Sequence, residues 1–366
     1  MPLQGLAVLP EPQGGHEHHI GSNQTKRRAL RPWSNLLSIW RGQVRMPLLV
    51  LSQWNSNKQN TVQLTSKKQG WRDSSATLVE RYGKCREIVS WGKFGIVFVS
   101  CKKKDNGAGE ELYAVKMFRR QPKETERMCI RRSTAEFCVS SALWHPNVIG
   151  TLDLLENERG NYCEVMEFCS GGDLHNLMRS VGKLKWQEAD CFFKQMIRGV
   201  EYIHKMGVAH LDLNPKNFLL TGDGLLKISG FGRSECVRLA WENDAHMVSG
   251  IRGSGPYIAP EEYTDGEFDG HAVDIWACGI VYMAMITGCP LWRTAKKSED
   301  SSYARYLKER RQQEGFSPIE SLPRLHNRNT IYCLLDPNPS SRPTASHVLR
   351  SEWGQEIKLC KANECF

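Results

Sequence analysis

The stretch "LKISGFG", Leu226 to Gly232, could belong to a catalytic site or to an ordinary turn. A short apolar segment leads into a turn with a glycine on either side of Phe231. Glycine adopts backbone angles that other residues avoid, so the stretch can be a flexible turn and nothing more. It can also be a metal-binding turn in which Gly230 stands in place of an acidic ligand. The choice between these interpretations decides whether the chain is an enzyme, and the local sequence does not make it.

A lysine on a predicted strand is a second candidate for chemistry. In "ELYAVKMF", residues 111–118, alternation puts Lys116 on the same face as Ala114 and Phe118. A cation on an inward face is costly unless a carboxylate pairs with it. Glu136, in the helix predicted next, is the expected partner. The alternative is two solvated surface charges.

A glycine-rich hairpin precedes that strand. "CREIVS" and "GIVFVS" are predicted strands on either side of "WGKF". Gly92 and Gly95 have no Cβ, so their backbone amides could approach phosphate oxygens closely. Taken alone, such a stretch is more often only a hairpin.

Hydrophobic periodicity predicts the elements that must position these residues. Further along, "NYCEVMEF" is an apolar strand, and the rest of the chain is mostly helical, with short strands at "FLLT" and "LLKIS". One helix before "HPN" has an apolar stripe, and a longer one ends near "HKMG". The stripe of the first consists of Ala135, Cys138, Val139, Ala142 and Leu143, and that of the second of Phe193, Met196, Ile197, Val200 and Ile203.

The run "IWACGIVYMAMITGCPLW", residues 275–292, has no charged residue. Its length reaches the lower limit of a membrane span, roughly 17–25 residues. Gly288 and Pro290 shorten it, and a helix that is apolar all round also suits the centre of a large lobe. We therefore predict a buried core helix, with a membrane anchor as the alternative.

Charge divides the chain near residue 78. Residues 1–77 contain ten Lys/Arg against three Asp/Glu, which accounts for +7 of the net charge of +9. This segment is predicted to be a basic, disordered extension; the alternative is a contact with an anionic membrane surface. The thirteen cysteines are scattered singly, as is typical of free thiols in a reducing compartment. With no secretory signal in the first residues, we expect a cytoplasmic protein.

From about residue 78 to 355, six motifs in order resemble the eukaryotic protein kinase domain. They are "SWGKFGIV", "YAVK", "HPNVI", "HLDLNPKN", "SGFG" and "APEE". Longer phrases such as "YCEVMEFCSGGDL" and "SEWGQEIKLCKA" are similar to the fungal Ser/Thr kinases that regulate plasma-membrane ion and nutrient transporters. The resemblance implies an α+β bilobal fold. A β-rich N-lobe with one regulatory helix would cover residues 78–168, a larger helical C-lobe residues 169–355, and a short tail residues 356–366.

The resemblance also assigns roles to residues. Asp212 would orient and deprotonate a Ser or Thr hydroxyl, and Asn217 would hold one Mg²⁺. Around ATP, Lys116 paired with Glu136 would position the α- and β-phosphates, and Gly92 and Gly95 would cover the phosphates. The remaining contacts would be Ile88, Val97 and Ala114 around the adenine, or as plain sheet residues, and Asp173 at the ribose, or as a helix N-cap.

Several catalytic positions depart from the family pattern. Gly230 stands where the metal-binding aspartate belongs, and Asn214 replaces the lysine that neutralises the transferred phosphate. Leu211 replaces an arginine, Lys216 an acidic residue, and Ser90 the first glycine. By contrast, Glu261 and Arg342 match the family's buried ion pair that holds the helical lobe together, and Asp274 matches the residue that steadies the catalytic loop.

Two functions remain open on this sequence. The first is a pseudokinase, or strongly impaired kinase, that binds ATP with Mg²⁺ weak or absent. The second is a Ser/Thr kinase of low rate. Expected partners are proteins, including an active kinase relative or members of a transporter-regulating pathway; no nucleic-acid partner is expected.

Overall fold

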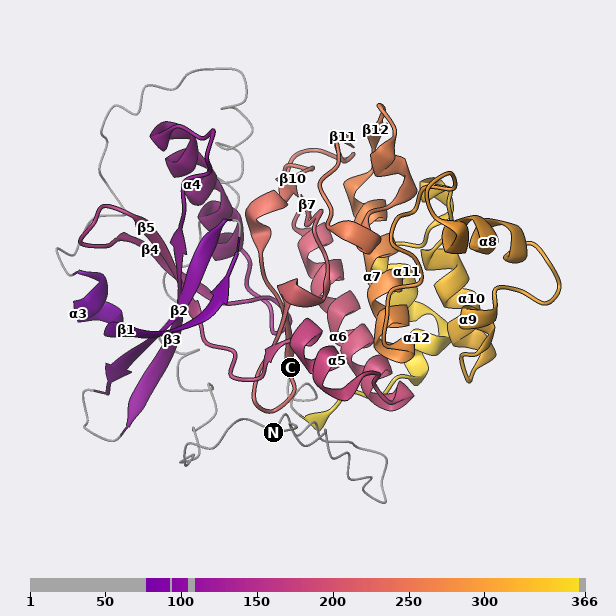
Figure 1. The fold of residues 1–366 in the computed structure, drawn as a ribbon, viewed down its shortest axis with the longest axis horizontal. Coiled ribbons are helices and arrows are strands. Elements are labelled where there is room, and N and C mark those ends of the chain that lie inside the picture. Colours follow the sequence, from indigo (N-terminus) through magenta and orange to yellow (C-terminus); the bar gives the residue numbers. More distant parts are fainter. Residues whose placement is uncertain (1–76, 93, 105–108, 362–366) are drawn as a thin grey trace.

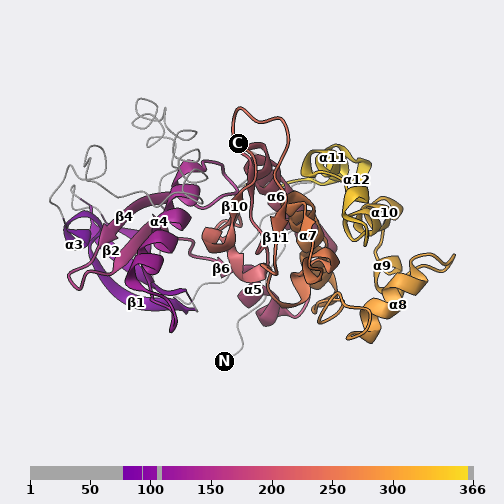
Figure 2. The same ribbon diagram turned by 90° about the horizontal axis from the view of Figure 1, so that it is seen from above.

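The computed structural model describes residues 77–92, 94–104 and 109–361. The strands of the five-stranded sheet gather in one lobe with a short helix and one long helix, and the remaining helices and short strands form a larger second lobe beside it (Figure 1). The view from above shows the same division (Figure 2). This is the predicted α+β bilobal architecture. The predicted extension 1–77 lies outside the described residues except for Thr77.

The N-lobe is a five-stranded antiparallel sheet in the order β1-β2-β3-β5-β4. The strands are β1 (Lys84–Trp91), β2 (Gly95–Lys103), β3 (Glu110–Phe118), β4 (Thr151–Glu156) and β5 (Tyr162–Glu167). Its helices are α3 (Leu78–Tyr82), which the sequence did not predict, and the long α4 (Glu126–Ala142). The hairpin around "WGKF" is confirmed as β1 and β2.

Strand register divides the N-lobe side chains between two faces. Val97, Lys116 and Glu164 are register partners across β2, β3 and β5, so they share a face. The opposite face carries a small core, to which Val115 and Val165 belong. The site therefore lies on the first face of this sheet.

The C-lobe is built on helices. They are α5 (Leu174–Val181), α6 (Trp186–Lys205), α7 (Gly270–Thr287), α8 (Ser301–Glu309), α9 (Ser317–Glu320), α10 (Leu325–Leu334), α11 (Ala345–Arg350) and α12 (Glu352–Glu356). Short strands join the catalytic segments: β6 (Gly172–Asp173) with β8 (Phe218–Leu220) and β9 (Leu226–Ile228), β7 (Val208–Ala209) with β10 (Glu235–Cys236), and β11 (Val248–Ser249) with β12 (Glu267–Phe268).

Helix α7 is the predicted core helix, and it begins five residues earlier than predicted. Within the described part of the chain it is the one helix long and apolar enough to cross a membrane, and 83% of its residues are buried inside the fold. Trp276, Ile280 and Tyr282 are fully buried. The packing of α7 against α6 accounts for its apolar surface.

Two details of the sequence prediction are corrected. Of the predicted stripe, Val139 and Leu143 are buried, whereas Ala135 and Cys138 are only half-buried. Glu136, Phe137 and Ser140 of α4 are buried as well, so the buried face is rotated from the predicted stripe. The predicted tail also begins inside the fold, since Lys194 donates to the Ile357 carbonyl (2.8 Å) and Cys360 is buried. All twelve cysteines among the described residues are free thiols, as predicted.

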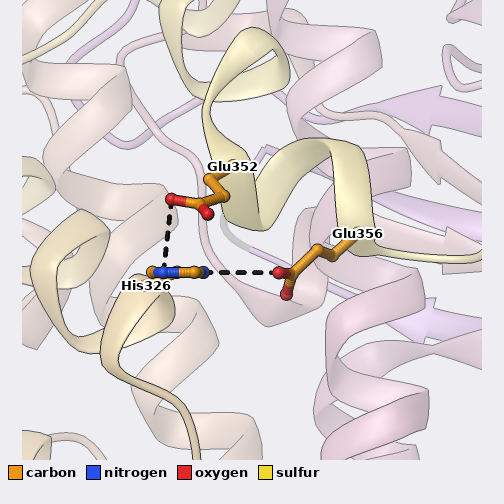
Figure 3. A group of neighbouring side chains, drawn as sticks. All are labelled: His326, Glu352 and Glu356. Carbon is orange, nitrogen blue, oxygen red and sulfur yellow. Dashed lines mark hydrogen bonds and ion pairs between the residues drawn. The ribbon is translucent and has the colours of Figure 1, made fainter.

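An exposed histidine links α10 to α12 (Figure 3). His326 Nε2 lies 3.2 Å from Glu352, and its Nδ1 lies 3.3 Å from Glu356. Arg324 adds a cation 3.3 Å from Glu356. Because each ring nitrogen faces a different carboxylate, the group is an ion-pair network that joins two helices.

Candidate active site

The predicted pair of Lys116 and Glu136 is formed. The Lys116 ammonium of β3 contacts Glu136 Oε1 of α4, with side chains 16% and 3% exposed. Burial at this level removes the alternative of two solvated surface charges. The pair fixes α4 against the sheet and places a cation on the sheet face that looks toward the catalytic loop.

Asp274 of α7 holds the start of the loop "HLDLNPKN" in place. Its carboxylate accepts the backbone N–H groups of His210 and Leu211, each at 2.8 Å, and contacts His204 Nε2 at 2.9 Å. Burial alone would raise the pKa of Asp274, but the hydrogen bond and charge of His204 hold it below its usual value. The sequence prediction that Asp274 steadies this loop fits the geometry.

Leu211 adopts a left-handed backbone, with φ of 63°. A bulky residue in this region is strained, and such strain persists only where the surroundings enforce it. The hydrogen bond to Asp274 and full burial of the leucine side chain enforce it here. The loop therefore keeps its shape with an apolar residue where the family has arginine.

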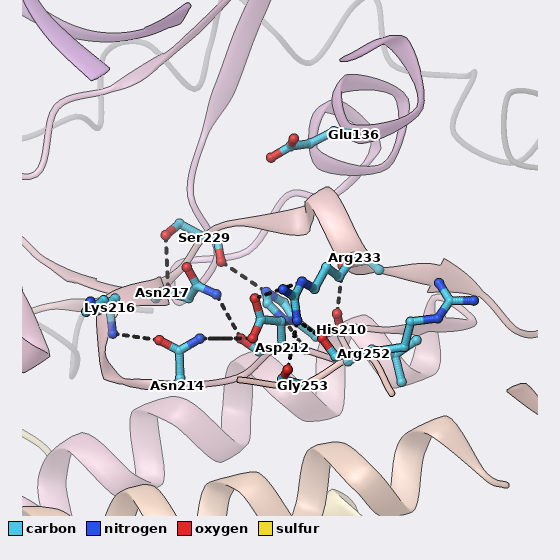
Figure 4. A network of polar contacts seen from close by, with 12 residues as sticks. Glu136, His210, Asp212, Asn214, Lys216, Asn217, Ser229, Arg233, Arg252 and Gly253 are labelled. Atoms are coloured by element: carbon cyan, nitrogen blue, oxygen red, sulfur yellow. Dashed lines mark hydrogen bonds and ion pairs between the residues drawn. The ribbon is translucent and has the colours of Figure 1, made fainter. Parts of the chain in front are cut away.

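Asp212 lies at the centre of a polar network (Figure 4). Asn214 Nδ2 donates to the Asp212 carbonyl at 2.8 Å and to its Oδ1 at 3.2 Å, and Asn217 Nδ2 donates to the same carbonyl at 2.8 Å. Arg233 Nε lies 3.6 Å from Asp212 Oδ2. The carboxylate is thus oriented between an amide and a guanidinium.

Arg233 is a site residue that the sequence reasoning missed. It follows the "SGFG" turn and also donates to the backbone carbonyls of Arg252 and Gly253, the latter at 2.8 Å. It therefore ties Asp212 to the later segment that ends in "APEE". The sequence feature that could have identified Arg233 is its position directly after the "SGFG" motif.

His210 contacts two neighbouring segments through its two ring nitrogens. Its Nδ1 accepts the Asp212 N–H at 3.3 Å, so Nε2 carries the proton and donates to the Ser229 carbonyl at 3.0 Å. The ring lies 5.1 Å from that of Phe231. These contacts join the catalytic loop to the "SGFG" turn.

Gly230 has a left-handed backbone, with φ of 81°. A Cβ built there would lie 2.6 Å from Asn217 Oδ1 and 2.8 Å from its Cγ, so the asparagine amide occupies the space of a side chain at residue 230. Mg²⁺ prefers carboxylate oxygens in an octahedral set. Asn217 offers one neutral oxygen at this point, and Gly230 offers no side-chain oxygen. The residues present therefore do not fit a two-ligand magnesium site.

The glycine-rich hairpin is placed as predicted, with one structural qualification. A Cβ on Gly95 would lie 2.6 Å from the Met117 carbonyl, so the approach of β2 to β3 already requires glycine there. A Cβ on Gly92 would meet only the Gly95 carbonyl, at 3.9 Å. Local packing therefore requires glycine at position 95 but not at position 92.

The register corrects one predicted adenine contact. Val97 and Ala114 lie on the same sheet face as Lys116, as predicted. Ile88 pairs with Phe98, which is next to Val97 along β2, so Ile88 lies on the opposite face. The irregularity of register between Ile88 and Ser90 was not visible in the sequence, and Ile88 fits the alternative of a plain sheet residue.

Asp173 is the N-cap of α5. Its Oδ1 accepts the Asn176 N–H at 2.7 Å, and Oδ2 accepts from Asn176 Nδ2 at 2.9 Å. Burial raises the pKa of Asp173, while the nearby charge of Lys216 acts in the other direction. The capping interpretation is thus realised in the structure, and ribose contact stays a prediction.

A second missed residue is Glu164 of β5. Its side chain is buried, and Ser140 Oγ of α4 donates to its Oε1 at 2.7 Å. It was hidden in "NYCEVMEF" because a single charge inside an apolar run does not disturb the strand pattern. It lies in register with Lys116.

The chain is similar in sequence to known proteins along most of its length. A model of the protein kinase domain matches residues 84–354. The chain is 57% identical over 289 residues to the serine/threonine-protein kinase hal4 of Schizosaccharomyces pombe, covering 79% of this chain and 45% of that protein. It is 51% identical over 314 residues to the serine/threonine-protein kinase HAL4/SAT4 of Saccharomyces cerevisiae, covering 84% and 51%.

A more distant relative is the probable serine/threonine-protein kinase KKQ8 of Candida glabrata. It is 34% identical over 351 residues, which cover 87% of this chain and 46% of that protein. The chain therefore spans about half the length of these relatives.

Proposed function

The chain belongs to the protein kinase family, and on that premise we propose that it is a pseudokinase or a strongly impaired Ser/Thr kinase that binds ATP between its lobes. The observation that carries the proposal is Gly230, whose missing side chain is replaced in space by the amide of Asn217. The turn keeps the left-handed backbone and lacks the carboxylate.

The energetic consequence is large. A bound metal supplies several kcal/mol of transition-state stabilisation to phosphoryl transfer. Each ~1.4 kcal/mol is a factor of ten in rate, so a loss of ~4 kcal/mol slows transfer about a thousandfold. Asn214 adds to the loss because a neutral amide stands where the family has a lysine.

The proposed binding of nucleotide depends on residues that the fold already holds in position. Lys116, held by Glu136, offers an ammonium to phosphate oxygens, and Gly92 offers an unobstructed backbone amide. Val97 and Ala114 offer an apolar surface on the same sheet face. These contacts need no metal, so we expect ATP to bind with Mg²⁺ contributing little.

The second candidate is a Ser/Thr kinase of low rate. It is favoured by Asp212, whose carboxylate is oriented by Asn214 and Arg233 and could still accept the proton of a substrate hydroxyl. In that case the two cations Arg233 and Lys116 would supply the charge that the family obtains from metal and lysine.

The cellular role is proposed from resemblance. As a pseudokinase, the chain would act in the cytoplasm on protein partners, either an active kinase relative or members of a pathway that regulates transporters. The excess of basic residues in 1–77 is the feature that would bring it to an anionic membrane surface.

The test is the initial rate of radiolabelled phosphate transfer by the full chain, to itself and to Ser/Thr peptides, with Mg²⁺ or Mn²⁺. We expect no transfer above background, or a rate far below about one per second, the slow end for active kinases. Turnover at that rate would refute the pseudokinase proposal and establish the second candidate.

A further inference from the structure

Glu164 is a buried carboxyl group that the proposed chemistry does not use. It lies near the middle of β5, with Lys116 of β3 and Leu154 of β4 as its register partners. Only 2% of it is exposed, and Ser140 Oγ donates to its Oε1 at 2.7 Å. Charging a carboxyl group in such a place is costly unless a cation compensates.

The cation that could compensate the charge of Glu164 is Lys116, which already forms an ion pair. Lys116 contacts Glu136, which lies one helical turn before Ser140 on α4. From the elements packed against Glu164, β3 thus presents one ammonium, α4 presents one carboxylate and one hydroxyl, and β4 presents the apolar Leu154. Glu136 Oε2 is itself buried and makes no hydrogen bond with the described residues.

Two carboxylates around one ammonium in a dry site cannot both ionise freely. Burial, and then the charge of Glu136, raise the pKa of Glu164 to about 7, although Lys116 and Ser140 act in the other direction. The proton on Glu164 is therefore lost near neutral pH.

We propose that Glu164 is a positioning residue for Lys116, and that its ionisation weakens the binding of nucleotide phosphates. When protonated, it leaves Lys116 paired with Glu136 and able to meet a phosphate. When ionised, it competes with Glu136 for the ammonium and adds a negative charge beside the phosphate position. The inference rests on the proposed binding of ATP, and deepens it.

The direction in which the Kd for ATP changes with pH follows from the linkage between proton binding and nucleotide binding. A bound phosphate raises the pKa of Glu164, so the nucleotide binds more tightly where Glu164 is protonated. The Kd for ATP should be constant well below pH 7 and rise as the pH passes through about 7. Each unit by which the nucleotide raises that pKa changes Kd by at most about tenfold.

The experiment is a titration of the full chain with ATP and EDTA from pH 5.5 to 8.5, comparing the parent with Glu164→Gln. Glutamine keeps the shape and the acceptor for Ser140 but cannot ionise. We expect its Kd to lack the rise seen in the parent, about three- to tenfold. ATP titrates in the same range, and because it does so equally for both proteins, their ratio isolates Glu164.

Two variants separate positioning from a merely structural role. Glu156→Gln, at the exposed end of β4, is the matched control and should keep the parent profile. Ser140→Ala removes a hydrogen bond that lowers the pKa of Glu164, so the midpoint of the parent profile should move to higher pH. Parallel profiles for the parent and Glu164→Gln would overturn the inference.

A measurement without nucleotide distinguishes a failure of the inference about Glu164 from a failure of the proposed ATP binding. The folded-state pKa of Glu164 is raised, so the stability that its proton contributes is present below the unfolded value of about 4.5 and is lost as pH rises to about 7. The melting temperature of the parent minus that of Glu164→Gln should therefore fall across this window and then level off. If this difference stays flat, the inference fails; if it falls but neither protein binds ATP at any pH, the proposed nucleotide binding fails instead.

Discussion

Gly230 combines a left-handed backbone with the smallest side chain, and both properties bear on what a revertant would do. Aspartate enters the left-handed region more readily than most residues, so the backbone angle of 81° is compatible with it. The space is less compatible, because a Cβ there would meet the Asn217 amide. Asn217 must rotate and give up its 2.8 Å hydrogen bond to the Asp212 carbonyl. Gly230→Asp should therefore carry a small loss of thermal stability.

Restoring two residues should restore phosphoryl transfer. Gly230→Asp returns a carboxylate ligand, and Asn214→Lys returns a cation for the transferred phosphate. Both act on one transition state, so their effects should be more than additive. We expect the double variant to exceed the parent by on the order of a hundredfold in the initial rate of Ser/Thr phosphorylation, given several kcal/mol for the metal alone.

Gly230→Ala is the matched control for this comparison. It introduces the same Cβ against Asn217 and no metal ligand, so it should reproduce the small loss of thermal stability without any gain in rate. A double variant that folds and stays silent would show that the defect lies elsewhere, with Ser90 and Lys216 the next positions to revert.

At this scale the sequence predicted some site residues well and others not at all. Lys116 and Glu136 were found because a strand has a period of two and a lone inward cation needs a partner. Ile88 was proposed as an adenine contact, and the irregularity of register that puts it on the other face leaves no mark in the sequence. Arg233 and Glu164 were missed because a charge in a turn or inside an apolar run carries no periodicity.

Helix α4 contributes Glu136 to the site. Its predicted apolar stripe included Ala135 and Cys138, yet the structure buries Glu136 and Ser140 instead. These polar residues face inward because Lys116 and Glu164 on the sheet satisfy them. A pattern of hydrophobicity treats every charge as outward, so it predicts the existence of such a helix and misplaces its buried face.

The segment ending in "APEE" is fixed to the C-lobe by a buried ion pair. Arg342 Nη1 and Nη2 donate to Glu261 Oε1 and Oε2 at 2.6 and 2.8 Å, and the arginine side chain is fully buried. This two-pronged geometry is specific to a guanidinium. The sequence had predicted the pair from motif positions 81 residues apart.

Breaking this ion pair should cost more than most substitutions. Arg342→Met leaves the Glu261 carboxylate buried without its partner, which we expect to lower the free energy of unfolding by about 3–5 kcal/mol in urea titrations. Arg86→Met removes an exposed pair with Glu110, and solvent screening means that it should lower the free energy of unfolding far less. If the Arg342 and Arg86 variants cost the same, the buried pair does not stabilise the lobe.

For the whole molecule, the order of elements was predictable because each is long and strongly periodic. The β-rich first lobe, helix α6 and the core helix α7 all follow from apolar spacing. The short strands β6, β7 and β10 to β12 were not, since two residues cannot show a period. These pieces join chain segments within the C-lobe, next to the site, so the sequence describes the scaffold better than the site it supports.

Nucleotide binding by the assembled lobes should stabilise the fold with little help from Mg²⁺. A ligand that binds only the folded state adds RT ln(1 + [L]/Kd), about 1.4 kcal/mol at ten times Kd. Lys116 and Gly92 are in place to bind phosphates, whereas the metal donor set at Asn217 and Gly230 is incomplete. We therefore expect ATP to raise the melting temperature of the full chain by a few degrees, equally with Mg²⁺ or with EDTA. Lys116→Ala should abolish the increase, and Gly230→Asp should make it depend on Mg²⁺. A large Mg²⁺-dependent gain in the parent would mean that a metal binds despite Gly230, and the proposed loss of the metal site would be wrong.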